Sequence, residues 1–316
     1  GALANIRMDG FDHDNSSSWS TYTIAITGSD PLFVIVGSAG KIMTSSDGIT
    51  WTLKSLVGVD SLIDVVYGDN KFVVTGESGT SITSSNGTTW SSVVNVGGGP
   101  GPYGPYMTGI TFGNSTFVTV GRAGAIRTSS NGTSWDIRTS GTIDLVDVVY
   151  GNSIFVAVGS SGTILTSSDG TSWDNRTSTS DTTSLLYSIT YGNSKFIAAG
   201  SGGKITTSSD GINWTEGTVG NNQNIYSITY GNSTFVTVGG DGKIFTSTDG
   251  STWTSRTSGK SIQLKGVTYG NNMFVVSGDS STILTSTDGV TWTQRTPGTL
   301  DPTDANNEFY GVVYKE

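Results

Sequence analysis

The chain has 316 residues, no cysteine and a formal net charge of −9, from 16 basic and 25 acidic residues. The absence of cysteine excludes disulfides, thiol catalysis and cysteine metal sites, and the acidic balance argues against binding nucleic acid or an anionic membrane. No apolar run approaches the length of a membrane span, and residues 1–7 lack the basic and apolar regions of an intact signal peptide.

The first 21 residues lie outside the regular repeat that fills the rest of the chain. We therefore expect an N-terminal arm at 1–21 and one domain at 22–316. The arm contains the single histidine, His13, between Asp12 and Asp14. Such oxygen ligands suit Ca²⁺, but the spacing of a full Ca²⁺ loop is absent. We interpret the arm as a solvated acidic segment that packs on the domain or links it to a larger assembly, and we predict no metal and no cofactor.

From residue 45 onward, a seven-residue motif, Ser-x-(Asp/Asn)-Gly-x-x-Trp, occurs seven times. Successive copies are about 40 residues apart, which indicates a repeat architecture. We refer to it below as the tryptophan motif. Its acidic or amide positions are Asp47, Asn86, Asn131, Asp169, Asp210, Asp249 and Asp288. Its tryptophans are Trp51, Trp90, Trp135, Trp173, Trp214, Trp253 and Trp292.

Each repeat contains four short strands separated by glycine-rich turns. In the sixth repeat we expect strands at 227–230, 235–238, 243–247 and 253–256, where β-branched and aromatic residues alternate with polar ones. The Asp-Gly and Asn-Gly pairs are hairpin signals, because glycine accepts a positive φ and the Asx side chain bonds the nearby backbone. The pattern predicts an all-β fold, a seven-bladed β-propeller of four-stranded antiparallel blades.

The first-strand pattern occurs eight times, once more than the tryptophan motif. Its copy at 25–28 is degenerate, and its last copy, at 311–314, has no blade after it. An open ring would expose two strand edges, which proteins avoid. We therefore expect the C-terminal strand to join the first blade and close the ring.

The repeat resembles the Asp-box (BNR-like) family of propellers. Residues 242–253, Gly-Lys-Ile-Phe-Thr-Ser-Thr-Asp-Gly-Ser-Thr-Trp, are similar in pattern to the repeats of photosystem II assembly factors and of sialidase-type propellers, and the match covers about residues 23–314. All seven copies lack one residue between Asp and Trp. The resemblance implies that the motif lies in the hairpin between the third and fourth strands, away from the usual ligand face, and is structural.

A sialidase-like glycosidase is the catalytic alternative. It needs three arginines on the substrate carboxylate, a tyrosine nucleophile and acidic partners. Four of the seven arginines stand three residues after a motif tryptophan, so we interpret them as structural: Arg138, Arg176, Arg256 and Arg295. Only Arg7, Arg122 and Arg127 depart from the period. We predict no catalytic residues and rank the glycosidase last.

The residues that do not follow the repeat are the candidate ligand contacts. An insertion at 97–107 joins two blades and carries Tyr103, Tyr106 and Met107, either as a recognition loop or as a rigid spacer. We expect the same face to carry charged residues from the short turns, namely Glu77, Arg122, Asp241 and Asp279. Four joint tyrosines have either a binding or a packing role: Tyr22, Tyr187, Tyr226 and Tyr310. The joint at 299–308 is another polar loop there.

The sequence therefore favours a non-catalytic recognition module that binds a surface glycan or protein receptor and does not insert into a membrane. Its low share of charged residues, 13%, and its Ser-, Thr- and Asn-rich surface are typical of a secreted, cell-surface or virion protein of the tail or fibre type. The alternative is a scaffold that binds a partner protein during assembly.

Overall fold

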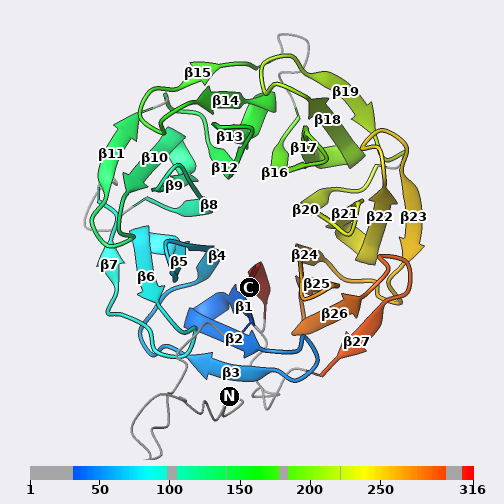
Figure 1. The fold of residues 1–316 in the computed structure, drawn as a ribbon, viewed down its shortest axis with the longest axis horizontal. Helices are drawn as coiled ribbons and strands as arrows, with labels where there is room; N and C mark the ends of the chain where they lie inside the picture. Colours follow the sequence, from blue (N-terminus) through cyan, green and yellow to red (C-terminus); the bar gives the residue numbers. More distant parts are fainter. Residues whose placement is uncertain (1–30, 98–104, 140, 178–183, 221, 297–307) are drawn as a thin grey trace, which may run out of the picture.

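The computed structural model is an all-β ring of seven four-stranded antiparallel sheets (Figure 1). The sequence prediction of a seven-bladed propeller is confirmed. The part of the chain that the structure describes contains no α-helix. The described residues are 31–97, 105–139, 141–177, 184–220, 222–296 and 308–316. The predicted N-terminal arm at 1–21 lies outside them.

Each blade runs from an inner strand, nearest the ring axis, to an outer strand. Blade 1 is β28 (Phe309–Lys315), β1 (Leu32–Gly37), β2 (Lys41–Ser45) and β3 (Thr52–Ser55). Blade 2 is β4 (Leu62–Gly68), β5 (Lys71–Gly76), β6 (Thr80–Ser84) and β7 (Val94–Asn95). Blade 3 is β8 (Met107–Gly113), β9 (Thr116–Gly121), β10 (Ala125–Ser129) and β11 (Asp136–Thr139). Blade 4 is β12 (Leu145–Gly151), β13 (Ile154–Gly159), β14 (Ile164–Ser167) and β15 (Asp174–Asn175).

The remaining blades repeat this plan. Blade 5 is β16 (Leu186–Gly192), β17 (Lys195–Gly200), β18 (Lys204–Ser208) and β19 (Thr215–Thr218). Blade 6 is β20 (Ile225–Gly231), β21 (Thr234–Gly239), β22 (Lys243–Ser247) and β23 (Thr254–Thr257). Blade 7 is β24 (Leu264–Gly270), β25 (Met273–Gly278), β26 (Thr282–Ser286) and β27 (Thr293–Arg295). In blades 1 to 6 a 3-10 turn joins the second and third strands: η1 (Ser38–Gly40), η2 (Glu77–Gly79), η3 (Arg122–Gly124), η4 (Ser160–Gly162), η5 (Ser201–Gly203) and η6 (Gly240–Gly242).

The C-terminal strand closes the ring, as the sequence predicts. β28 pairs antiparallel with β1, with Phe33 opposite Tyr314 and Ile35 opposite Val312. It therefore supplies the inner strand of a blade whose other three strands come from the start of the domain. This pairing satisfies the edge of β1, which an open ring would leave exposed. The degenerate copy at 25–28 lies outside the described residues.

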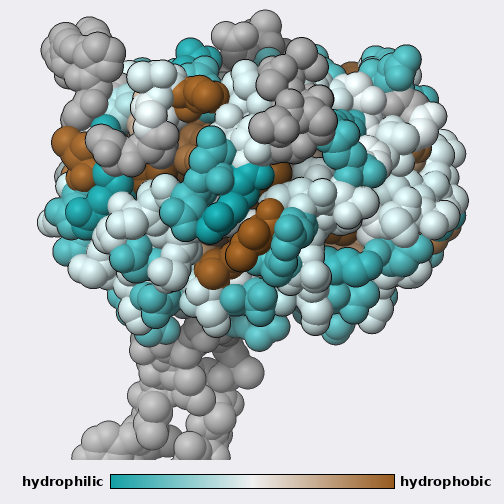
Figure 2. All heavy atoms as spheres, turned by 90° about the horizontal axis from the view of Figure 1, so that it is seen from above, coloured by the Kyte–Doolittle hydropathy of each residue, from teal (hydrophilic) through white to brown (hydrophobic). Residues whose placement is uncertain are grey.

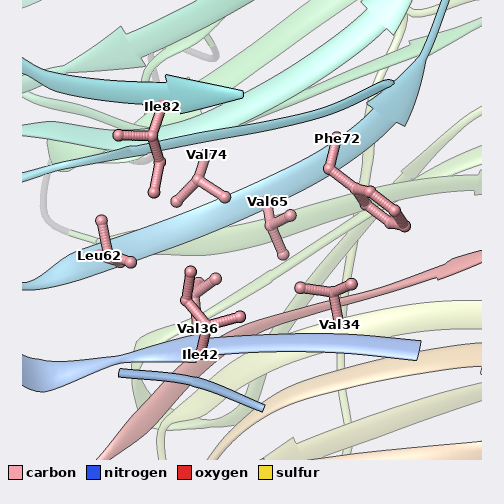
Figure 3. Close-up of a cluster of buried hydrophobic side chains, with 8 residues drawn as sticks. All are labelled: Val34, Val36, Ile42, Leu62, Val65, Phe72, Val74 and Ile82. Carbon is pink, nitrogen blue, oxygen red and sulfur yellow. The ribbon is translucent and has the colours of Figure 1, made fainter. Parts of the chain in front are cut away.

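The core lies between neighbouring blades. The cluster between blades 1 and 2 contains Val34, Val36, Ile42, Leu62, Val65, Phe72, Val74 and Ile82 (Figure 3). A phenylalanine of the second strand is fully buried in every blade: Phe33, Phe72, Phe117, Phe155, Phe196, Phe235 and Phe274. Close blade contact also requires glycine at the end of each inner strand from β4 to β24. A Cβ on Gly270, for example, would lie 2.0 Å from the ring of Tyr314.

The tryptophan motif forms the turn between the third and fourth strands. In all seven copies the glycine N–H donates to the serine Oγ at 2.8 Å. Asp47 Oδ1 accepts the N–H groups of Ile49 and Thr50, and these bonds lower the pKa of Asp47 to about 2. The Trp51 indole donates to the Gly48 carbonyl at 3.1 Å. Trp51 is 3 % exposed, whereas the other six motif tryptophans are half-buried.

The outside of the ring is mostly polar. Hydrophilic and neutral residues cover most of the side shown in Figure 2, with a few small apolar patches between them. Within the described ranges no helix has the length and apolar character that crossing a membrane requires. The same residues contain no group of three or more histidine, cysteine, aspartate or glutamate side chains placed to hold a metal ion.

Candidate functional site

The 3-10 turns and the joints between blades share one face, which we call the joint face. Within a blade, the first N–H of the turn donates to the carbonyl just before the inner strand, as from Arg122 to Tyr106 at 3.0 Å. The same bond joins Glu77 to Ser61 and Ser38 to Glu308. The third strand starts at this turn and ends at the tryptophan motif, so the motifs lie at the opposite face.

The second residue of each inner strand lies at a shift in the pairing register, close to the joint face. The shift falls at Lys265 in β24, for example, between Leu264 and Gly266. Blades 5, 6, 7 and 1 carry aromatic or charged side chains there: Tyr187, Tyr226, Lys265 and Tyr310. Blades 2, 3 and 4 carry Ile63, Thr108 and Val146. At this position, blades 5, 6, 7 and 1 therefore differ from blades 2, 3 and 4 in their side chains, although the backbone repeats.

Several side chains that depart from the repeat interact on the joint face. Lys265 forms ion pairs with two carboxylates, through Nζ to Asp279 Oδ1 at 2.9 Å and to Glu308 Oε2 at 2.8 Å. The Tyr310 hydroxyl also donates to Glu308 Oε2, at 2.8 Å. The Lys265 ammonium lies 4.8 Å from the centroid of the Tyr310 ring. Blades 7 and 1 are thus joined by a compact polar network.

A second pair lies at the start of blade 3. The Cζ atom of Arg122 is 4.3 Å from the centroid of the Tyr106 ring, a cation–π distance. Tyr106 lies close enough to Glu77 and Lys265 for their charges to shift its pKa, and the charge of Glu77 also raises the pKa of Tyr310. The network of blades 7 and 1 and the Arg122–Tyr106 pair therefore form one group. We call this group the axial cluster: Glu77, Tyr106, Arg122, Lys265, Asp279, Glu308 and Tyr310.

The network fixes the charge states of the axial cluster. Burial opposes the charge of Lys265, but hydrogen bonds with Glu308 and Asp279 raise its pKa above the usual value. The hydrogen bond from Lys265 lowers the pKa of Glu308. Burial, followed by Glu308, raises the pKa of Tyr310, and burial and then Glu77 raise that of Tyr106. At neutral pH Lys265 is therefore a cation, Glu308 is a carboxylate, and Tyr106 and Tyr310 are neutral phenols.

Four of the seven predicted ligand residues belong to this cluster: Glu77, Tyr106, Arg122 and Asp279. The prediction for Met107 is wrong, because its side chain is 0 % exposed and packs beside Val96 and Ala125. It occupies the first position of an inner strand, which is a core position. Asp241 is exposed in η6, and no described interaction joins it to the cluster. Tyr103 and Tyr22 lie outside the described residues.

The sequence reasoning missed Lys265, and it also missed two partly buried carboxylates. Asp64 accepts the N–H groups of Val65 and of Ile110, the latter from the next blade at 2.9 Å. Asp147 in blade 4 likewise accepts the N–H groups of Val148 and, from blade 5, of Ile189. Burial raises the pKa of both carboxyl groups. A signal was available in the sequence, since an acidic residue occupies the third position of an otherwise apolar inner strand.

In the blade that precedes each of these aspartates around the ring, the corresponding inner-strand position is a glycine. A Cβ on Gly311 would lie 2.8 Å from the Asp64 Cα, and one on Gly109 would lie 2.8 Å from the Asp147 Cα. In blades 5 and 6 the same bridging position is a serine, and the Ser188 hydroxyl accepts the N–H of Ile228. Asp64 and Asp147 therefore belong to the contacts between blades, and we assign them no role in binding.

A concavity of about 220 Å³ lies away from the axial cluster, on blade 4. It opens beside the two-residue outer strand β15 and is lined by Ile143, Leu145, Ser161, Thr163, Leu165, Asn175 and Thr177. Its lining is mainly apolar and contains no charged side chain. The axial cluster is therefore the stronger candidate for specific recognition, because specificity at an interface depends on placed polar and aromatic groups.

The fold defines the class of protein as a seven-bladed β-propeller. Residues 188–309 match the family described as the DUF6242 β-propeller domain. No curated protein matches this sequence. The family match and the fold support a propeller family in general, and the narrower Asp-box relationship stays a prediction.

Solved structures of similar fold include two of YCF48. "YCF48 bound to D1 peptide" has 16% identity and a TM-score of 0.59, covering 74% of this chain and 80% of that chain. YCF48 from Cyanidioschyzon merolae has 15% identity and a TM-score of 0.57, covering 78% and 86%. The WD40 β-propeller domain of Doa1 has 14% identity and a TM-score of 0.59, covering 75% and 82%. At these identities the similarity shows the fold alone.

Proposed function

We propose that the chain is a protein-binding module that holds a segment of a partner protein against the axial cluster and performs no catalysis itself. The observation that supports this most is the convergence of aperiodic charged and aromatic side chains on one face. Tyrosine and arginine are enriched at the energetic centres of protein interfaces. That one similar propeller is seen with a peptide favours a protein segment as the ligand.

The protonation states of the cluster argue for recognition over hydrolysis. A general acid at neutral pH needs a carboxyl group whose pKa is raised. Hydrogen bonds have the opposite effect on Glu308, whose pKa is lowered. Tyr310 donates its hydroxyl to that carboxylate, and its pKa is raised, so it is a poor nucleophile. These groups suit the placing of a ligand by charge and ring contacts.

Binding of a glycan or receptor at a cell or virion surface stays a prediction from the sequence, as does a location outside the cell. Tyrosine rings and carboxylates also suit sugars. A glycan array separates the two functions. Binding to a defined glycan that Tyr106→Ala abolishes would favour the lectin-like role over the protein-binding role.

The direct test is stoichiometric co-purification of a partner, followed by affinity measurements on variants. We expect Tyr106→Ala and Tyr310→Ala each to weaken binding about tenfold or more, as at interface hot spots. Ile212→Ala is the matched control, because Ile212 is 50 % exposed on the opposite face beside a tryptophan motif. Equal affinity of both tyrosine variants and wild type, with the folded state intact by circular dichroism, would rule out the axial cluster as the site.

A further inference from the structure

The guanidinium group of Arg122 lies against the Tyr106 ring and has no anionic partner among the residues that the structure describes. Arg122 is exposed at the start of η3, and its Cζ atom lies 4.3 Å from the Tyr106 ring centroid. Across the described part of the chain, no side chain forms an ion pair or a hydrogen bond with this guanidinium. None of its five N–H donors is thus used by a side chain of the described residues.

The other described arginines behave differently. In each, Nε donates a hydrogen bond within the protein, either to a threonine hydroxyl or to a carbonyl: Arg127, Arg138, Arg176, Arg256 and Arg295. Two of them also form ion pairs, Arg138 with Asp136 and Arg176 with Asp174. Arg122 thus stands apart from a set of arginines that are otherwise used to hold strands together.

We infer that Arg122, held against Tyr106, binds a carboxylate of the partner segment through two of its N–H groups. This inference rests on the proposed protein-binding function. Stacking on a ring leaves the edge of the guanidinium free, and its planar fork matches the two oxygens of a carboxylate. Because the ring already restricts the side chain, less conformational entropy is lost when the carboxylate binds.

The rest of the axial cluster agrees with this assignment. Lys265 does not compete for the same ligand, since Asp279 and Glu308 already pair with it. Glu77 opposes the binding of a carboxylate at Arg122. The charge of Glu77 acts on Tyr106, and it would also repel an incoming carboxylate. The geometry therefore makes two opposite predictions: removal of the Arg122 fork weakens carboxylate binding, and neutralisation of Glu77 strengthens it.

The test uses the full chain labelled with ¹⁵N-arginine, with the Nε–H resonances followed by NMR. The probes are a capped tripeptide with a free C-terminal carboxylate, a capped tripeptide with one aspartate side chain, the uncharged tripeptide amide, and inorganic phosphate. Sodium chloride at equal ionic strength is the control. We expect a saturable shift of the Arg122 resonance with both carboxylate peptides, and no shift with the amide. Arg122→Lys assigns the resonance and should weaken peptide binding about tenfold, whereas Arg256→Lys should leave it unchanged.

Glu77→Gln provides a readout that a purely structural Arg122 would not give. We expect it to tighten carboxylate binding severalfold with the fold unchanged. An Arg122 resonance that moves only as it does with chloride would overturn the inference, as would binding of phosphate but of neither carboxylate peptide. Either result leaves the proposed function standing, because that function is tested separately, by the effect of the tyrosine variants on partner affinity.

Discussion

Phe309 tests whether the C-terminal strand closes the ring by burying its side chains in the core. Phe309 is the first residue of β28 and is 0 % exposed, among Phe33, Ile35 and Val275 at the contact between blades 7 and 1. Phe309→Ala removes a ring from a packed site and leaves a cavity. Substitutions of this kind cost about 3–5 kcal/mol.

The matched control is Phe309→Leu. Leucine occupies the same inner-strand position in blades 2, 4, 5 and 7, at Leu62, Leu145, Leu186 and Leu264. Because it keeps most of the buried volume, we expect a loss of about 1 kcal/mol.

The assay is urea unfolding followed by tryptophan fluorescence, supported by calorimetry. At roughly 2 °C per kcal/mol for a domain of this size, Phe309→Ala should lower the melting temperature by about 6–10 °C. An unfolding free energy for Phe309→Ala within about 1 kcal/mol of wild type would refute the claim that β28 is packed into the ring.

Three further predictions concern the scaffold. Trp51→Ala should cost about 3–5 kcal/mol in urea unfolding, and the half-buried Trp135→Ala less, since the two differ in the area they bury; an equal effect would contradict this. Burial raises the pKa of Asp64 above its ordinary 3.8, so its contribution to stability is fully present below that pH and is lost as the pH rises through the folded pKa. Wild type should therefore be less stable at pH 8 than at pH 5, and Asp64→Ser should reduce that difference; an unchanged difference would exclude Asp64 as its source. Lys315→Ala should cost about 1–2 kcal/mol, because this 6 % exposed side chain lies 5.3 Å from the Tyr67 ring where other inner strands have glycine; a melting temperature equal to that of wild type would contradict this.

The architecture could be predicted from the sequence because its causes are local and repeated. A hairpin turn such as that at Asp47 is built from neighbouring residues, so seven copies predict seven turns. The closure by β28 followed from counting inner strands and from the cost of an open edge. Each of these inferences needed only the order of residues along the chain.

The axial cluster could not be predicted in full because it depends on contacts across the ring. Lys265 and Glu308 are 43 residues apart, and only the closing strand brings them together. Met107 was misassigned because its neighbours in the sequence are a Gly- and Pro-rich insertion, although its place in the repeat is that of the buried Leu62. Asp64 was missed because its partner, the Ile110 N–H, belongs to another blade.

The most direct test of the protein-binding account is hydrogen exchange measured by mass spectrometry on the chain with and without its co-purified partner. The account predicts slower exchange on binding at η2, η3 and the starts of β8, β24 and β28, where the axial cluster lies. Exchange at the tryptophan motifs and around the blade 4 concavity should be unchanged. Protection confined to those other regions, with none at the starts of β24 and β28, would contradict the account.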